Sequence, residues 1–399
     1  MNYKNLISKK YLRKNIYLKY SKGFKSVQLQ LEKDILSKNK TLSVLNKDYQ
    51  FNFKFKNLKQ FSKFNTIAII GMGGSILGAE AIESFLKKKI RKNLYFFNDL
   101  NEEKILSFKK KNKNQKVLFI VVSKSGNTIE TITNLFLLNP NKSKKNIIII
   151  TEKKNNFLYL LSKKLNYFYI EHKKFIGGRY SVLSEPGMIP AYLMGINIVK
   201  IRSKIRESLK GRLKTFLKDS SIKLADLMNS KKFNNLIFLN YSPELEKFLV
   251  WCQQLIAESL GKKNKGFLPV ISNVPKDHHS LMQLYLDGPK DKIFYVFSHE
   301  NKSKKIINID KRLKLNNFLN GRDLNSIKNA QKNALIKSFK KNNIPFREFK
   351  IKKINEETLG KLFSYFILET VIIGKLLKIN PFDQPAVEQV KTYTKNLLS

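Results

Sequence analysis

The stretch VLFIVVSKSGNTIET (residues 117–131) joins six apolar residues to nine that are rich in hydroxyl and amide side chains. A short apolar run that ends in turn residues is typical of a buried strand. A loop of this composition is usually only a turn. It also suits an anion if a helix follows, because the first turn of a helix has unpaired N–H groups and a partial positive charge. The stretch therefore predicts a strand–loop–helix unit with a candidate anion site.

The same alternation of apolar runs and helical patterns continues on both sides of this stretch. Before it, TIAII leads through the glycine turn GMGGS into a helical pattern. Other apolar runs of strand length are LYFF, NIIII and YFYI, and, after a Lys-rich helical bridge at about residues 199–232, NLIFLN, FLPVIS and IFYVF. Strands that alternate with helices are typical of parallel sheets covered on both faces. We therefore predict an α/β fold with two doubly wound parallel sheets.

Domain boundaries are expected where this alternation of strands and helices starts and stops. Residues 1–58 are predicted to be an N-terminal helical segment, because their clearest periodicity is helical, at residues 24–38. The first α/β domain is expected at residues 59–200. The second is expected at residues 201–380, and a C-terminal helix is expected at residues 381–399.

The overall composition excludes some classes of protein. The apolar content of 42% is enough for packed cores, and no run approaches the roughly 20 apolar residues that a membrane span needs. The N-terminus is basic but lacks an apolar signal-peptide core, so no signal peptide is predicted. The single cysteine, Cys252, allows no internal disulfide and suits a reducing compartment. We expect a cytoplasmic protein without a membrane partner.

A formal net charge of +47 would normally suggest a nucleic-acid partner. However, only nine of the 77 basic residues are Arg, and the Lys excess is spread through the chain together with many Asn, Ile, Phe and Tyr residues. These residue types use A/T-rich codons, so the composition of the coding sequence explains the charge. We expect no specific nucleic-acid partner, and keep nucleic-acid association as a competing hypothesis.

Two loops, GMGGS and SKSGNT, could together bind a phosphate group, because ligands bind at the carboxyl ends of parallel strands. The first has neither the dinucleotide G-x-G-x-x-G spacing nor a P-loop signature, and by itself it could be a tight turn. The two loops together are harder to dismiss, because both supply small residues and hydroxyl groups. The candidate phosphate-binding residues are Gly73, Gly74 and Ser75 in the first loop, and Ser123, Lys124, Ser125 and Thr128 in the second.

Four further stretches contain polar residues that packing does not require. They are FIGGRYSVLSEPGMIP with Arg179, WCQQLIAESLGKKNKGFLPV with Glu258, KDHHSLMQLYLDGP with a histidine doublet, and NPFDQPAVEQVKTYTK with Lys391. Each has a structural explanation when taken singly. Arg179 could be an ion-pair partner, Glu258 an exposed carboxylate at a helix end, and His279 a neighbour of a helix cap.

Taken together, these motifs identify a resemblance. GMGGSILG, SKSGNTIET, GGRYSVLS, QLIAESLGK, DHHSLMQL and NPFDQPAVEQVK follow the order and approximate spacing of the phosphoglucose isomerase family, over about residues 67–391. The resemblance implies two sugar-isomerase (SIS) domains of αβα sandwich type. It also implies a homodimer with no metal or cofactor, which interconverts glucose 6-phosphate and fructose 6-phosphate in glycolysis and gluconeogenesis. Ala386 departs from the glycine usual in the family's QPGVE motif.

The resemblance also implies residue roles. Glu258 matches the base that moves a proton between C2 and C1, and Arg179 matches the cation beside the enediolate. His279 and Lys391 match the positions that open the sugar ring. His279 is preferred to His278 because it directly precedes Ser280, and in the family this histidine reaches across the dimer interface. Ser75, Ser123, Lys124, Ser125 and Thr128 match phosphate-binding positions, beside the substrate loop of Gly73 and Gly74.

Two competing hypotheses remain. A noncatalytic SIS-domain sensor of a sugar phosphate would use the two loops, but it gives no reason for Glu258, Arg179, His279 and Lys391 to occur together. A nucleic-acid-associated protein would explain the charge and none of the motifs. Binding without turnover would favour the sensor. Salt-resistant, sequence-independent binding would favour nucleic acid.

Overall fold

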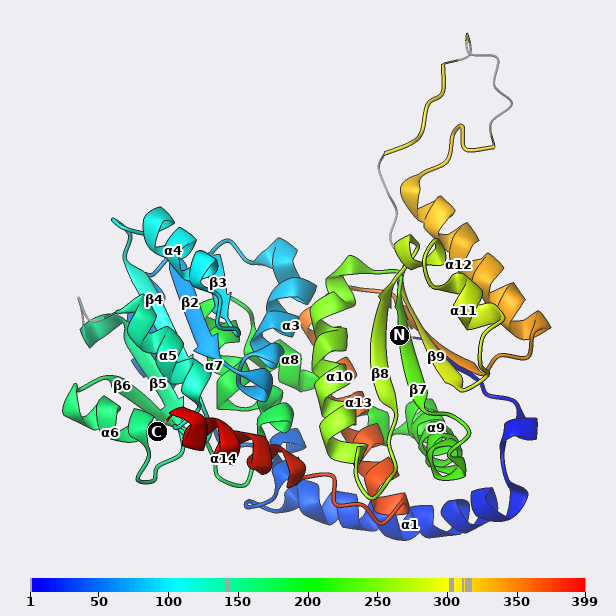
Figure 1. The fold of residues 1–399 in the computed structure, drawn as a ribbon, viewed down its shortest axis with the longest axis horizontal. Coiled ribbons are helices and arrows are strands. Elements are labelled where there is room, and N and C mark those ends of the chain that lie inside the picture. The colour runs from blue at the N-terminus through cyan, green and yellow to red at the C-terminus, as the bar shows by residue number, and fades with distance from the viewer. Residues whose placement is uncertain (1, 141–143, 301–304, 311, 313–317, 399) are drawn as a thin grey trace.

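The computed structural model describes residues 2–140, 144–300, 305–310, 312 and 318–398. Two five-stranded sheets lie side by side, each with helices on both faces (Figure 1). In the first sheet the strand order is β3-β2-β4-β5-β6, and every pair is parallel. Its strands are β2 (Thr66–Gly71), β3 (Asn93–Phe97), β4 (Val117–Val122), β5 (Ile147–Thr151) and β6 (Phe168–Glu171).

Alternation of buried side chains explains why helices cover both faces of this sheet. In β4, Phe119 and Val121 pack into one apolar cluster, whereas Leu118 and Ile120 pack into another. The first cluster lies under α4 (Glu102–Lys111), α5 (Ile129–Leu138) and α6 (Phe157–Lys164). The second lies under α3 (Leu77–Leu86) and α7 (Glu185–Leu193). Strands that are buried on both faces read as continuous apolar runs, as VLFIVV does.

The second sheet has the order β1-β10-β9-β7-β8. Pairing is parallel among β7 (Asn235–Asn240), β8 (Leu268–Asn273), β9 (Lys292–His299) and β10 (Phe346–Ile351). One face is covered by α11 (Met282–Leu286) and α12 (Leu324–Lys341). The other is covered by α9 (Gly211–Ser230), α10 (Glu246–Leu260) and α13 (Glu356–Leu376). The predicted fold class, with two doubly wound parallel sheets, is confirmed.

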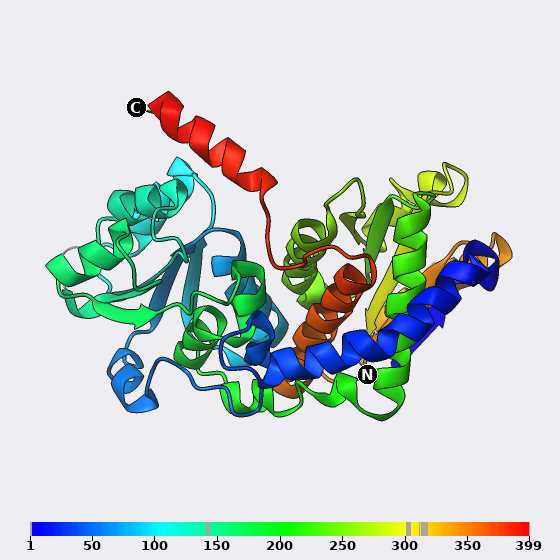
Figure 2. The ribbon, with the colours of Figure 1, turned by 90° about the horizontal axis from the view of Figure 1, so that it is seen from below.

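The N-terminal segment contains, besides its helix, a strand that was not predicted from the sequence. Strand β1 (Asn2–Leu6) pairs antiparallel with β10, and Tyr3 stacks on Phe216 and Tyr365. Five residues are too few to show a periodicity, and the partner strand is more than 300 residues away in the sequence. The predicted helix begins earlier than expected, as α1 (Lys14–Leu36). It runs along the second half of the molecule and contacts α9 and α13 (Figure 2).

The core between the two sheets fixes the two halves against each other. Helices α3 and α10 pack together there, and α13 is buried along most of its length (Figure 1). The remaining helices are α2 (Phe55–Leu58), α8 (Ile198–Ser203) and α14 (Ala386–Leu398). Helix α14 has no buried residue and projects from the body (Figure 2). Among the described residues, no helix is both long and apolar enough to cross a bilayer.

Candidate active site

The glycine loop after β2 is shaped to receive the segment that carries Arg179. Residues Gly73–Ser75 form one 3₁₀ turn, and Gly73 has φ +51°, a left-handed conformation that favours glycine. A Cβ atom at Gly74 would overlap the Gly178 carbonyl group and the backbone nitrogen of Arg179. Ser181 Oγ then donates to the Gly74 carbonyl oxygen at 3.3 Å. Any larger residue at Gly74 would therefore push Arg179 out of place.

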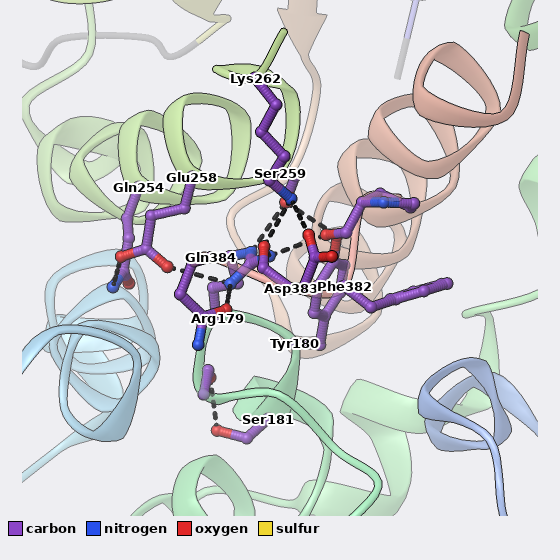
Figure 3. A network of polar contacts seen from close by, with 12 residues as sticks. Arg179, Tyr180, Ser181, Gln254, Glu258, Ser259, Lys262, Phe382, Asp383 and Gln384 are labelled. Atoms are coloured by element: carbon purple, nitrogen blue, oxygen red, sulfur yellow. Dashed lines mark hydrogen bonds and ion pairs between the residues drawn. The ribbon is translucent and has the colours of Figure 1, made fainter. Parts of the chain in front are cut away.

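Arg179 is 2% exposed and uses its whole guanidinium group within the site (Figure 3). Nε donates to Ser259 Oγ at 2.8 Å, and Nη1 donates to Gln384 Oε1 at 2.8 Å and to Glu258 Oε2 at 3.0 Å. Nη2 donates to the carbonyl oxygens of Pro381 at 2.8 Å and Asp383 at 3.1 Å. Because a guanidinium has five N–H donors in a rigid plane, these contacts fix its position and orientation.

Glu258 lies in the last turn of α10, with its side chain 31% exposed. Oε2 faces Arg179, whereas Oε1 accepts a hydrogen bond from Gln254 Nε2 at 2.9 Å. Gln254 is one helical turn earlier, so both side chains lie on the same face of the helix. The carboxylate is thus held from two sides and remains open to solvent, as a base that reacts with a small molecule must be.

The second loop contains a compact group of hydroxyls at the start of α5. Ser123 Oγ lies 2.8 Å from Thr128 Oγ1, and Ser125 Oγ lies 3.3 Å from the same atom. Thr128 is the N-cap residue of α5, yet it makes no capping hydrogen bond with its side chain. The first N–H groups of α5 and the hydroxyls therefore lie together, in the arrangement that suits an anion.

Lys124 adds a positive charge to this loop. Its Nζ lies 3.6 Å from Glu152 Oε1. Burial lowers the pKa of the Lys124 ammonium, and Glu152 opposes that shift. A bound anion would act in the same direction as Glu152 and stabilise the charged form.

Both loops lie at the same edge of the first sheet. Gly71 and Val122, the last residues of β2 and β4, are paired in the parallel register, so the residues that follow them are neighbours. The order β3-β2-β4 reverses direction between these two strands, which is where ligands bind in open α/β sheets. The structure therefore brings the two predicted phosphate loops together, and the first of them also contacts the Arg179 segment.

The histidine doublet follows β8, a strand of the second sheet. His278 Nε2 lies 2.8 Å from the Tyr241 hydroxyl, and burial lowers the pKa of His278. His279 is exposed. Within the described part of the chain, neither imidazole makes a hydrogen bond or ion pair with Arg179 or Glu258.

Lys391 is also outside the network. It lies on α14, where its Nζ donates to Glu388 Oε1 at 2.7 Å. In the described residues no contact joins it to Arg179 or Glu258. The structure thus brings together Arg179, Glu258 and the loops, and leaves His279 and Lys391 apart from them. The same residues contain no group of three or more His, Cys, Asp or Glu side chains that could hold a metal ion.

Comparison with known proteins shows the family of the chain. The family model described as phosphoglucose isomerase matches residues 52–399. The chain belongs to the phosphoglucose isomerase family. A relative from Methanococcus maripaludis, named probable glucose-6-phosphate isomerase, is 33% identical over 94% of this chain and 87% of its own. The glucose-6-phosphate isomerase of Methanocaldococcus jannaschii is 30% identical over 86% of this chain and 87% of its own.

Solved structures share the phosphoglucose isomerase fold seen here. A hypothetical protein from Thermus thermophilus superposes with a TM-score of 0.82 at 23% identity, over 96% of both chains. A glucose-6-phosphate isomerase from Chlamydia trachomatis superposes with a TM-score of 0.71 at 19% identity, over 86% of this chain and 71% of its own. At these identities the two superpositions support the fold.

Some residues of the candidate site in this phosphoglucose isomerase family member were not predicted from the sequence. Gln384, which contacts Arg179, lies inside the motif NPFDQPAVEQVK but was not predicted to be a site residue. Gln254 contacts Glu258, and its helical i, i+4 spacing was the available signal. Ser259 directly follows Glu258 and could have been found only from the fold.

Lys262, Asn380 and Asp383 form a polar cluster, here called the latch, which holds the loop that contacts Arg179. Lys262 Nζ donates to the Asn380 carbonyl oxygen at 2.6 Å and to Asp383 Oδ1 at 2.7 Å, and also contacts the Asp383 carbonyl oxygen. Asn380 Nδ2 donates to Asp383 Oδ2 at 2.8 Å, and the hydrogen bond from Lys262 lowers the pKa of Asp383. Because the Asp383 and Pro381 carbonyl oxygens accept from Arg179, the latch positions the cation (Figure 3).

Proposed function

We propose that this chain is an aldose–ketose isomerase that interconverts glucose 6-phosphate and fructose 6-phosphate. The observation that carries the proposal is the contact between Arg179 and Glu258, 3.0 Å apart where the two halves of the molecule meet. It joins a fixed cation to a solvent-accessible carboxylate beside a loop that suits phosphate. The family and the names of the relatives support the same reaction.

Substrate binding begins with the phosphate. We propose that the hydroxyls of Ser75, Ser123, Ser125 and Thr128 and the ammonium of Lys124 bind the 6-phosphate, while Gly73 and Gly74 allow the backbone to approach it. The N-terminus of α5 adds its partial charge to this site. A phosphate group bound at one end of the sugar leaves C1 and C2 free to lie against another part of the site. Binding at the phosphate therefore helps to position the reacting carbons.

Proton transfer is proposed for Glu258. The carboxylate removes the proton from C2 of the open-chain aldose, and the electrons move to form the C1–C2 double bond and a negative charge on oxygen. The carboxyl group then delivers a proton to C1, and this proton can exchange with solvent first because the Glu258 side chain is partly exposed. The hydroxyl proton shifts from O2 to O1, so that the ketose forms without net oxidation. Arg179 stabilises the enediolate, because a guanidinium stays charged and can donate to adjacent oxygens. This route needs acid–base groups and a cation, so we propose no metal or cofactor.

Ring opening requires an acid–base pair at O5 and O1, and we propose His279 and Lys391 for it. His279 is exposed and belongs to the segment after β8, whereas Lys391 is on the projecting helix α14. We therefore propose a homodimer in which His279 of one copy completes the site of the other. Co-refolding of His279→Ala with Glu258→Gln should restore part of the activity. Mixed dimers that form and stay inactive would contradict the shared site.

The residue ranges 59–200 and 201–380 are proposed to be the two SIS domains, with the site between them. We also propose a cytoplasmic location, which the single cysteine supports, because Cys252 is a buried free thiol.

The direct test of the reaction is a coupled assay. Purified protein is given fructose 6-phosphate, and glucose-6-phosphate dehydrogenase reports the product through NADPH. We expect turnover in the unmodified chain and almost none in Glu258→Gln, a control that also excludes contaminating host isomerase. Sugar-phosphate binding without any turnover in the unmodified chain would reject the isomerase and favour the sensor hypothesis.

A further inference from the structure

The second sheet repeats the strand order of the first. Counted along the chain, β7, β8, β9 and β10 are ordered 2-1-3-4, as are β2, β3, β4 and β5 in the first sheet. The direction of the order therefore reverses between β7 and β9, at the place that corresponds to the gap between β2 and β4. The proposed phosphate loops follow β2 and β4, so the equivalent edge of the second sheet is a second position where a ligand can bind.

A cavity of about 270 Å³ lies at that edge. It is lined by the segment after β7, the end of β9 and the first three turns of α12. Its charged or titratable lining residues are Tyr241, Glu244, His299, Lys328 and Lys332, and two serines, Ser242 and Ser298, contribute further hydroxyls. The cavity is separate from the Arg179 network, since none of the residues of that network lines it.

Lys332 is the most unusual of these residues, because it is only 4% exposed. Its Nζ lies 3.3 Å from Ser298 Oγ and 3.9 Å from Glu348 Oε1. An ammonium has three donors, so these two long contacts leave part of its hydrogen-bonding capacity unused. Burial lowers the pKa of Lys332, because removal from water makes the charged ammonium less stable. An anion in the cavity would offset this destabilisation.

Other donors in the lining are free within the described part of the chain. The Lys328 ammonium, the His299 imidazole and the side-chain amides of Asn325 and Asn329 make no hydrogen bond or ion pair there. The one lining carboxylate, Glu244, accepts a hydrogen bond from Ser242 Oγ at 3.2 Å. Of the two carboxylates near the ammonium groups, Glu244 has this hydrogen bond and Glu348 lies beside Lys332. The Lys328 ammonium, the imidazole and the two amides are therefore left as donors for a negatively charged ligand.

We propose that this cavity is a second anion site, which binds the phosphate group of a small phosphorylated metabolite. Lys328 and Lys332 supply the charge, and His299, Ser298 and the two asparagines supply directed hydrogen bonds. The volume exceeds what a bare phosphate needs, so part of the esterified group enters as well. The site uses no residue assigned to isomerisation, and the inference stands whether or not that reaction is confirmed.

The test uses the four histidines of the chain as reporters. The full-length protein is labelled at histidine Cε1, and the His299 resonance is assigned with His299→Gln. Inorganic phosphate and glycerol 3-phosphate are then titrated at fixed pH and ionic strength. We expect a saturable shift of His299 with both ligands, at lower concentration for the ester. Lys328→Gln should raise the apparent Kd about tenfold, the order expected for the loss of one charge-assisted contact.

Two controls separate this site from the loop after β4. Lys337→Gln removes an exposed charge from the same helix and should leave the titration unchanged. Ser123→Ala with Thr128→Val removes hydroxyls from the other loop and should also leave the His299 titration unchanged. A His299 shift that never saturates, or that responds equally to Lys328→Gln and Lys337→Gln, would overturn the proposal. A His299 shift abolished by the Ser123 and Thr128 changes would overturn it too.

Discussion

Nη1 of Arg179 donates to Glu258 Oε2 at 3.0 Å and to Gln384 Oε1 at 2.8 Å. One guanidinium nitrogen thus links the proposed base on α10 to the loop that precedes α14. The consequence is that the position of the cation and the position of the carboxylate are set together, before any substrate binds.

Arg179→Lys should test the geometry of the cation. An ammonium keeps the charge but cannot reproduce the planar set of contacts to Ser259, Gln384 and the two carbonyl oxygens. We expect kcat to fall by about 10²–10³, the range for loss of a transition-state donor, with a much smaller change in KM. Steady-state kinetics measure this, with Arg212→Lys at an exposed position as the matched control. Equal kcat in both variants would show that charge alone is sufficient.

The latch between Lys262 and Asp383 should behave as a unit. Because both residues hold the loop that contacts Arg179, Lys262→Met and Asp383→Asn should each lower kcat by about tenfold or more, as small misplacements of reacting groups do. The double variant should be hardly worse than either single variant, and a double-mutant cycle measures this coupling. Lys263→Met, one position along, is the control. Simple multiplication of the two single effects would mean that the residues act independently.

His172 should weaken the protein in acid. It is completely buried and its Nε2 has no hydrogen-bond partner in the described residues, and burial lowers its pKa from 6.5 to about 4. Between pH 6.5 and about pH 4, His172 is protonated in the unfolded chain but not in the folded chain. The free energy of unfolding is therefore highest above pH 6.5 and falls as the pH decreases toward 4. The loss should be about 2 kcal/mol between pH 7 and pH 5.

Chemical denaturation at several pH values measures this loss of unfolding free energy. In His172→Gln the slope with pH should be shallower by that amount, since the amide does not titrate. A variant with the same slope as the unmodified chain would assign the acid sensitivity to other groups.

The buried pair of Arg347 and Glu369 should dominate the stability of the second half. Arg347 donates to both carboxylate oxygens, at 3.0 and 2.9 Å, and to the hydroxyls of Tyr295 and Tyr365. Glu369→Ala leaves a buried cation without its counter-charge, so we expect a loss of about 3–5 kcal/mol of unfolding free energy. Glu357→Ala, at a more exposed position of the same helix, should change little. Similar losses in both variants would contradict the assigned role of burial.

Local sequence patterns predicted the parts of the fold that depend on neighbouring residues. VLFIVV became β4 because six apolar residues suit a strand buried on both faces, and the loops after β2 and β4 followed from their turn residues. Strand β1 and the partners Gln384 and Ser259 of Arg179 were missed, because each depends on residues far apart in the chain. No local period records such a contact.

Isomerisation in D₂O tests the role of Glu258 most directly. In the proposed mechanism Glu258, held by Arg179 and Gln254, moves a proton between C2 and C1. The unmodified chain should introduce deuterium at these carbons of the sugar phosphates, as mass spectrometry or proton NMR would detect. Glu258→Gln should bind fructose 6-phosphate with a similar Kd and introduce almost none. Deuterium incorporation by Glu258→Gln at the rate of the unmodified chain would show that Glu258 is not the base.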